Sequence, residues 1–206
     1  MKVLYIHNLE TEKEDSLKDW VNNIKHLNHH ITILSNSTDL ENSSFIKDTG
    51  IKIRLLQIPT PDSFINKLKI IGKYRSEILN ILKEDTPNLI YSRFSYISPA
   101  VKKALEGLQF LAKITIPSII EISEDTHDKL ICKKNSMLVK LFYKHIQYIV
   151  FHYANLIICP SNISESIVSS SRIEPKKIFK ISGIEINSAE LSKVLTLSEK
   201  MLTNSK

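Results

Sequence analysis

The sequence predicts an α/β fold, in which a parallel β-sheet carries helices on both of its faces. Short apolar runs rich in β-branched residues alternate with longer segments whose apolar residues recur every three or four positions. Such alternation of strands and helices favours parallel strands joined by helical crossovers. The chain has 206 residues, 42% of them hydrophobic and 24% charged, which is ordinary for a globular domain that forms a core without disulfides. We therefore predict a Rossmann-like parallel sheet.

Seven segments have the composition of strands. The third alternates apolar and charged residues and is followed by Pro59 and Pro61, so we expect it near an edge of the sheet. Pro160 is expected to end the sixth strand. The predicted strands cover residues 3–6, 31–34, 51–56, 89–91, 118–122, 156–159 and 177–181.

Helices are predicted between and after these strands. In the first, Leu17, Trp20, Val21 and Ile24 recur at helical spacing and form one apolar stripe. The last is interpreted as a tail, which divides the chain into a domain over residues 1–187 and a helical tail over 188–206. The predicted helices cover residues 16–27, 63–83, 99–113, 135–153, 161–170 and 188–202.

The charge and the cysteine content of the chain indicate its cellular location and the kinds of partner it can bind. The formal net charge is +6, which indicates either a solvated lysine-rich surface or attraction to anionic lipids or phosphorylated substrates. Lys and Arg residues are spread along the chain without aromatic interleaving, so we expect no nucleic-acid partner. Cys132 and Cys159 lie among apolar neighbours and are expected to stay reduced. Neither a signal peptide nor a membrane-spanning run is evident, so a cytoplasmic location is predicted, at the inner face of the membrane if the lysines bind lipid.

Polar residues follow the predicted strands, where ligands bind in open parallel sheets. Arg93 is a candidate for binding a phosphate or carboxylate, because a guanidinium matches two oxygens at once. The alternative is an ion pair of Arg93 with Glu121 or Glu124, and more generally that strand-end loops are polar in any soluble protein. The substrate-binding candidates are Asn8, Glu10, Arg93, Ser95, Ser123, Glu124 and Ser161.

His127 is the candidate catalytic residue. It lies close in sequence to Glu124 and Asp125, and a carboxylate partner would orient the imidazole and tune its pKa for acid–base work. The alternative is a surface histidine at the start of a helix. His26, His29 and His30 form a cluster without a cysteine or carboxylate at ligand spacing, so no metal site is predicted.

Glycine-rich phosphate loops are absent from the sequence. The segment after the first strand, residues 8–14, contains no glycine and three glutamates, which argues against a nicotinamide or flavin dehydrogenase. The sequence also contains neither a Gly-Lys-Ser/Thr loop nor a serine nucleophile elbow. No cofactor is therefore expected.

Six segments in order resemble the N-terminal domain of the family-four retaining glycosyltransferases, which have the two-lobed GT-B architecture. In the second segment, His29 and His30 stand where the family has a Gly-His pair before an apolar strand. The others resemble the first strand, the strand ending in Arg93, the strand ending in Glu121, an Ala-Asp-x-Ile-Ile-x-x-Ser motif and the stretch that leads to the second lobe. The six segments are residues 2–6, 24–34, 87–93, 116–121, 154–161 and 175–185.

This resemblance implies an acceptor-side lobe that works with a donor-binding lobe. Such an enzyme transfers a sugar from a nucleotide sugar, which is a substrate and not a cofactor, to a glycan or lipid-linked acceptor without a metal. Three features depart from the family: the glycines after the first strand are missing, Ser123 replaces a usual His or Arg, and the sequence stops soon after Glu185. We therefore expect the donor lobe to be absent from this chain, supplied by a separate protein partner, and the chain alone to be inactive. The alternative is a non-catalytic binding or scaffold domain, or a truncated remnant of a glycosyltransferase.

Overall fold

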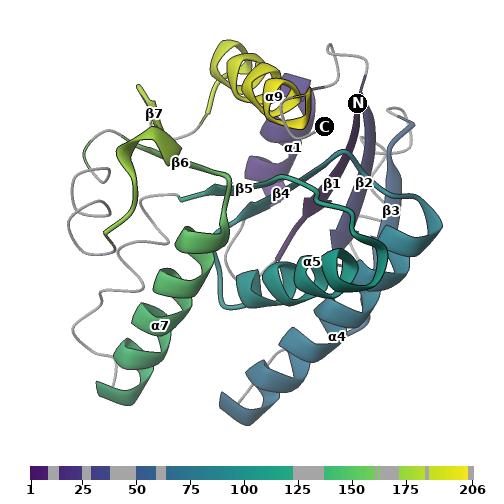
Figure 1. Ribbon diagram of the computed structural model, residues 1–206, viewed down its shortest axis with the longest axis vertical. Helices are drawn as coiled ribbons and strands as arrows, with labels where there is room; N and C mark the ends of the chain where they lie inside the picture. The colour runs from purple at the N-terminus through teal and green to yellow at the C-terminus, as the bar shows by residue number, and fades with distance from the viewer. Residues whose placement is uncertain are drawn as a thin grey trace.

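A seven-stranded parallel sheet is the centre of the molecule (Figure 1). The computed structural model describes residues 1–8, 14–24, 29–37, 50–58, 64–122, 137–160, 162, 172–183 and 186–203. The strand order is β3-β2-β1-β4-β5-β6-β7, and every neighbouring pair is parallel. The strands are β1 (Lys2–Ile6), β2 (His30–Ser35), β3 (Lys52–Leu55), β4 (Leu89–Arg93), β5 (Ser118–Glu121), β6 (Leu156–Pro160) and β7 (Ile178–Ile181). This confirms the predicted α/β class and the edge position of the third strand.

Helices cover both faces of the sheet. One face carries α4 (Phe64–Glu84), α5 (Ser98–Ala112) and α7 (Met137–Tyr153), and the other carries α1 (Glu14–Ile24) and α9 (Ser188–Thr203). A short 3-10 helix, η2 (Pro175–Lys177), precedes β7. Within the described part of the chain, no helix combines the length and hydropathy that crossing a bilayer requires.

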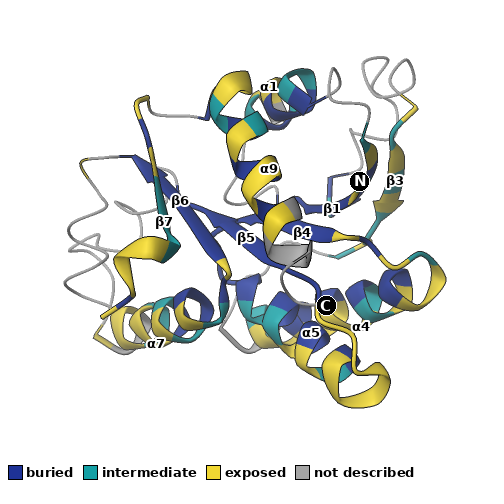
Figure 2. Cartoon of the chain, turned by 45° about the horizontal axis from the view of Figure 1, so that its top comes forward, coloured by how far each residue is buried: buried dark blue, intermediate teal, exposed yellow. Residues whose placement is uncertain are grey.

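Alternate residues of the inner strands enter two separate hydrophobic cores, whereas the edge strand β3 exposes Lys52 and Arg54. The larger core packs α4, α5 and α7 against one face of the sheet, with Leu4, Ile90 and Ile120 among its strand residues. The smaller core packs α1 and α9 against the other face, with Tyr5, Trp20 and Tyr91 at its centre. Figure 2 shows the buried strands enclosed between helices whose outer faces are exposed. The sheet is therefore buried on both faces, as parallel sheets require.

Most predicted elements agree with the structure to within a few residues. The helix predicted at 63–83 is Phe64–Glu84, and the one predicted at 135–153 is Met137–Tyr153. The sixth strand differs slightly, because Pro160 belongs to it and pairs in register with Ile181. The helix predicted at 161–170 lies outside the described residues, apart from Asn162.

The final helix covers the sheet instead of extending away from it. Leu191, Val194 and Leu195 are buried in the smaller core, and α9 lies against α1. Asn23 Nδ2 on α1 also donates a hydrogen bond of 3.3 Å to the carbonyl oxygen of Ile186, just before α9. Residues 188–203 thus complete one face of the sheet.

Candidate functional site at the carboxyl edge of the sheet

The strand order reverses between β1 and β4. From β1 the chain continues outward to β2 and β3, and from β4 it continues in the opposite direction to β5, β6 and β7. In open parallel sheets, ligands bind outside the carboxyl ends of the strands at such a reversal. His7 and Arg93 lie at this point, because Ile6 and Ser92 are partners in the β1–β4 register. This edge is the candidate site that the fold itself selects.

His7 is held by hydrogen bonds from three directions. Its backbone N–H donates to the carbonyl oxygen of Leu34 at 2.9 Å, and its own carbonyl oxygen accepts from Tyr74 Oη at 3.2 Å. Its Nδ1 lies 2.8 Å from Ser35 Oγ, and both side chains are fully buried. Ser35 Oγ also accepts from the backbone N–H of Ser37 at 3.0 Å, so its own proton can be donated to Nδ1 of His7.

Arg93 and Glu121 form a buried ion pair beside His7. Arg93 Nη2 lies 3.2 Å from Glu121 Oε1, and the two side chains are only 6% and 1% exposed. Glu121 Oε2 accepts a hydrogen bond of 2.7 Å from Tyr91 Oη. Burial raises the pKa of Tyr91 well above its usual range, and the neighbouring negative charge of Glu121 raises it further. Tyr91 therefore remains a protonated donor to the carboxylate at all ordinary pH values.

An aromatic cluster of Tyr5, Trp20 and Tyr91 packs next to the side chains of His7, Arg93 and Glu121, on the same face of the sheet. The rings of Tyr5 and Tyr91 stack with centroids 5.5 Å apart, and Trp20 of α1 lies 4.2 Å from Tyr5 and 5.2 Å from Tyr91. Three large rings that contact one another leave little freedom for the strand ends above them. The ion pair and the histidine are consequently carried on a rigid base, as a preorganised binding edge requires.

Three of the predicted site residues are described by the structure. Asn8 is 3% exposed and follows β1 directly, and Arg93 is 7% exposed and ends β4. Ser95 is 2% exposed, and its side chain takes part in the turn that starts α5: its Oγ accepts from Ile97 N–H at 3.4 Å. Its backbone N–H donates to Ser98 Oγ at 2.9 Å. The remaining candidates, Glu10, Ser123, Glu124, His127 and Ser161, lie outside the described residues.

The structure brings Asn8 and Arg93 to the same edge and adds four residues to them. Glu121, the ion-pair partner of Arg93, is one of the two acidic residues that the sequence offers for this pairing, the other being Glu124. His7 and Ser35 directly follow the first and second predicted strands, so the strand-end rule selects them. Tyr91 is not selected, because it looks like an ordinary strand residue until the register is known. The sequence does contain a signal for these positions. His7, Ser35 and Tyr91 alternate in step with the strand residues of the smaller core, which places their side chains on that face of the sheet.

Donors dominate the chemistry of this edge. A guanidinium and an imidazole at adjacent strand ends suit the oxygens of hydroxyl, carboxylate or phosphate groups. Among the described residues, no group of three His, Cys, Asp or Glu side chains is arranged to hold a metal ion. The described geometry is thus that of a polar binding edge.

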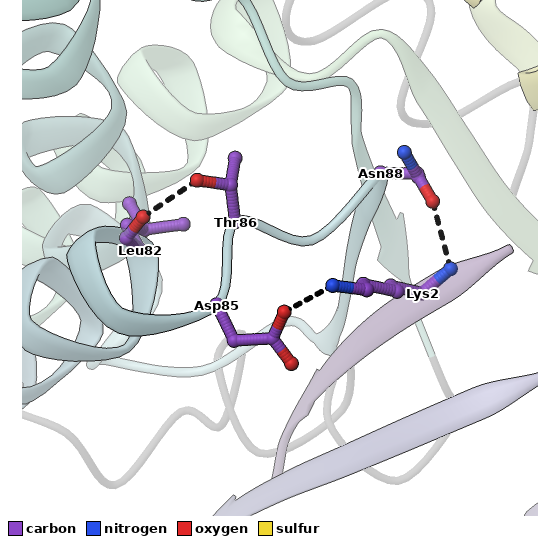
Figure 3. A network of polar contacts seen from close by, with 5 residues as sticks. All are labelled: Lys2, Leu82, Asp85, Thr86 and Asn88. Carbon is purple, nitrogen blue, oxygen red and sulfur yellow. Dashed lines mark hydrogen bonds and ion pairs between the residues drawn. The ribbon is translucent and has the colours of Figure 1, made fainter.

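A hollow of about 420 Å³ lies at the opposite, amino-terminal edge of the sheet, between the starts of β1, β2 and β3. Two of its charged side chains, Lys2 and Asp85, form an ion pair, and Lys52 also lines the hollow. Arg54 and Glu84, which pair with each other, line an adjoining hollow. Figure 3 shows how Lys2 ties the strand to the turn after α4, since its backbone N–H also donates to Asn88 Oδ1 at 2.8 Å. The hydrogen bond from Lys2 is the main reason that the pKa of Asp85 lies below its usual value. These contacts fasten the ends of elements together, so the carboxyl edge is the stronger candidate.

No protein-family model matches the chain, and no curated protein matches its sequence. Solved structures do match. Sucrose-phosphate synthase from Thermosynechococcus elongatus has a TM-score of 0.62 at 10% identity, over 88% of this chain and 47% of that one. The lipopolysaccharide outer core galactosyltransferase WaaB has a TM-score of 0.56 at 15% identity, over 87% and 44%. UDP-GlcNAc 2-epimerase from Methanocaldococcus jannaschii has a TM-score of 0.53 at 14% identity, over 88% and 45%.

The likeness covers nearly all of this chain but less than half the length of each of these proteins. At 10–15% identity such a match establishes the fold and not the activity. The three proteins are named as a synthase, a galactosyltransferase and an epimerase, so the fold is shared by more than one reaction. The chain therefore has the Rossmann-like fold of one lobe of the GT-B architecture.

Proposed function

We propose that this chain is the acceptor-binding lobe of a glycosyltransferase, which transfers a sugar from a nucleotide sugar to a glycan or lipid-linked acceptor. The observation that carries the proposal is the buried row of Ser35, His7, Arg93 and Glu121 at the switch point of a sheet with this fold. The edge offers oxygen-binding donors on a rigid base, which suits a hydroxyl-rich acceptor.

The donor would be bound by another lobe, in a separate protein partner. The segment after β1 lacks glycine and carries glutamates, so its backbone is poorly suited to approach a pyrophosphate, and its charge repels one. Contact with the donor phosphates from this side is therefore not expected. The proposal assigns nucleotide-sugar binding to the partner lobe and acceptor binding to this chain.

Within this scheme Arg93 and Glu124 orient the acceptor, and His127 is the base or hydrogen-bond partner of the attacking hydroxyl. The proposal also assigns Asn8, Glu10, Ser95, Ser123 and Ser161 to binding of the acceptor. The fixed position of Arg93 supports its part, because Glu121 holds the guanidinium within the β4–β5 register. Pre-positioned charge is what an acceptor site needs to hold a hydroxyl in line for attack.

The test is transfer by a complex reconstituted from this chain and the donor-binding lobe, supplied with a panel of nucleotide sugars. We expect His127→Ala to lower the turnover number about a hundredfold, the lower range for loss of a general acid or base. His30→Ala is the matched control, because His30 is exposed at the amino-terminal edge and should leave turnover unchanged. Equal turnover of the two variants would remove His127 from the site.

The second candidate function is a non-catalytic binding or scaffold domain, or a remnant of a transferase. The glycine-free, acidic segment after β1 and the serine at position 123 favour it. A purified chain that binds neither glycan nor nucleotide sugar in calorimetry, and yet forms a defined complex with a protein partner, would support this alternative over the first.

A further inference from the structure

An apolar stripe runs along the exposed face of α7. Met137, Leu141 and Tyr148 have 77%, 53% and 55% of their surface exposed. Leu141 and Tyr148 follow Met137 by four and eleven positions, and this spacing places all three on one face of the helix. Large apolar side chains exposed together on one helix mark an interaction surface more often than single ones do.

Polar and basic side chains flank this stripe, and no acidic residue interrupts it. Lys140 and Lys144 are exposed and lie on one side of the stripe, while His145 and His152 lie on the other. The sequence Met137–Tyr153 contains no aspartate or glutamate. Within the described part of the chain, Lys144 takes part in no ion pair. The face is therefore both apolar and positively charged.

The first half of α4 has the same character. Leu68 is 47% exposed, and Lys69, Lys73 and Arg75 are exposed beside it. No acidic residue occurs in α4 before Glu77. Lys67, by contrast, points to the chain itself, since its Nζ lies 5.2 Å from the ring centroid of Tyr96.

The two helices begin at the same edge of the sheet. Helix α4 follows the carboxyl end of β3, α7 follows that of β5, and both cover the face that α5 also covers. Figure 1 shows the N-terminal halves of α4 and α7 projecting past α5 on the side toward which the strands point. We call their exposed residues Leu68, Lys69, Lys73, Arg75, Met137, Lys140, Leu141, Lys144 and Tyr148 the α4–α7 surface.

We infer that the α4–α7 surface docks on an anionic lipid bilayer. A basic helix face with exposed apolar residues binds such a surface by lysine attraction to the headgroups and by burial of the apolar side chains among them. A soluble polyanion would use the lysines and leave Met137 and Leu141 in water. The inference rests on the proposed function in one respect: docking by this edge would bring the acceptor-binding row toward a lipid-linked acceptor.

The test measures partition of the purified chain onto vesicles, without donor or acceptor, so that it can fail independently of glycosyl transfer. We expect binding to vesicles of equal parts phosphatidylglycerol and phosphatidylcholine, and little to phosphatidylcholine alone. Lys140→Gln combined with Lys144→Gln should lower the partition coefficient about 25-fold, from about fivefold per lysine. The control removes the same charge from the opposite layer, with Lys18→Gln on α1 and Lys193→Gln on α9, and should change partition little.

A second pair of variants tests the apolar part of the surface. Met137→Ser combined with Leu141→Ser should lower partition roughly tenfold, because two partly inserted side chains are lost. Far-UV circular dichroism should be unchanged, since both side chains are exposed. The inference is overturned if the serine pair binds as the parent does, or if inorganic polyphosphate at equal phosphate concentration displaces the parent from vesicles. Either result would identify a site for a soluble polyanion.

Discussion

At the scale of single residues, the carboxylate of Glu121 joins β4 to β5 within the candidate site. It accepts from Tyr91 Oη at 2.7 Å and pairs with Arg93 at 3.2 Å, and all three side chains are buried. Tyr91→Phe removes one donor to a buried carboxylate and leaves the packing of the ring unchanged. We expect the free energy of unfolding to fall by about 1.5–3 kcal/mol in urea denaturation.

Tyr148→Phe is the matched control for Tyr91→Phe, because Tyr148 is 55% exposed and its hydroxyl loses only contact with solvent. Its free energy of unfolding should agree with that of the parent to within about 0.5 kcal/mol. If both variants were equally stable, the Tyr91–Glu121 bond would contribute nothing and Glu121 would depend on Arg93 alone.

Site residues could be predicted from sequence where their position at the end of a strand identifies them. They could not be predicted where the role of a residue depends on a contact with a residue far away in the sequence. Asn8 and Arg93 could be placed at the site because each follows a recognisable strand. The bond between His7 and Ser35 joins residues 28 positions apart, and it exists only because β1 and β2 pair in one particular register. Register is set by the whole sheet, so no local pattern reveals it.

At the scale of elements, α9 begins with a reciprocal cap. Asn187 Oδ1 accepts from Glu190 N–H at 2.9 Å, and Glu190 Oε2 accepts from Asn187 N–H at 3.2 Å. Glu190 Oε1 also accepts from the backbone N–H and the hydroxyl of Ser182 after β7. This arrangement satisfies donors at the start of the helix and ties the helix to the end of β7.

The cap predicts a pH dependence of stability. Partial burial raises the pKa of Glu190, but the hydrogen bonds from Ser182 and Asn187 outweigh it and hold the pKa below its ordinary value of 4.5. A lowered folded-state pKa contributes stability above about pH 4.5, and this contribution is lost as the pH falls through the folded-state value. Glu190→Gln should therefore cost about 1 kcal/mol in urea denaturation at pH 7 and progressively less below pH 4.5.

Glu106→Gln provides the comparison for Glu190→Gln, because Glu106 lies half-exposed on α5 and pairs with Lys102 one turn away. Such a pair contributes about 0.3–0.5 kcal/mol. A difference between the parent and Glu190→Gln that stayed constant from pH 7 to pH 3 would show that the carboxylate charge plays no part in the cap.

A glycine in the middle of α4 offers a second prediction for an element. Gly72 is exposed, and a Cβ added to it meets no atom within 4 Å. Gly72→Ala should raise the free energy of unfolding by about 0.5–1 kcal/mol, because alanine loses less backbone entropy in a helix. Gly50→Ala is the opposite case: Gly50 has φ of +69°, so alanine there is strained and should lower thermal stability. Equal effects of both substitutions would contradict the conformational argument.

Elements were predictable because periodicity is a local property. The stripe of Leu17, Trp20, Val21 and Ile24 identified α1, and all four side chains are buried in the structure. The boundaries were less certain, as at Pro160, because a strand ends where its neighbour stops pairing and not only where its own sequence changes.

At the scale of the whole molecule, the sequence indicates parallel strands but not their order. Alternating helices and strands are compatible with several arrangements, and the reversal between β1 and β4 depends on which crossovers pass over which face. The candidate site depends on that reversal. The sequence is enough to assign the site to the carboxyl edge of the sheet. It is not enough to predict the row of side chains from Ser35 to Glu121, because these residues come from four different strands.

The packing of α9 makes a prediction about cooperativity. Leu191 is fully buried in the same core as Trp20, the only tryptophan of the chain. Leu191→Ala should cost about 2–5 kcal/mol, whereas Leu197→Ala, at a position 37% exposed, should cost much less. Because α1, α9 and the sheet share this core, Trp20 fluorescence and far-UV circular dichroism should give coincident urea transitions in the parent and in both variants. If α9 were an independent tail, Leu191→Ala would leave the fluorescence transition in place, and helical signal would be lost first at lower urea concentration.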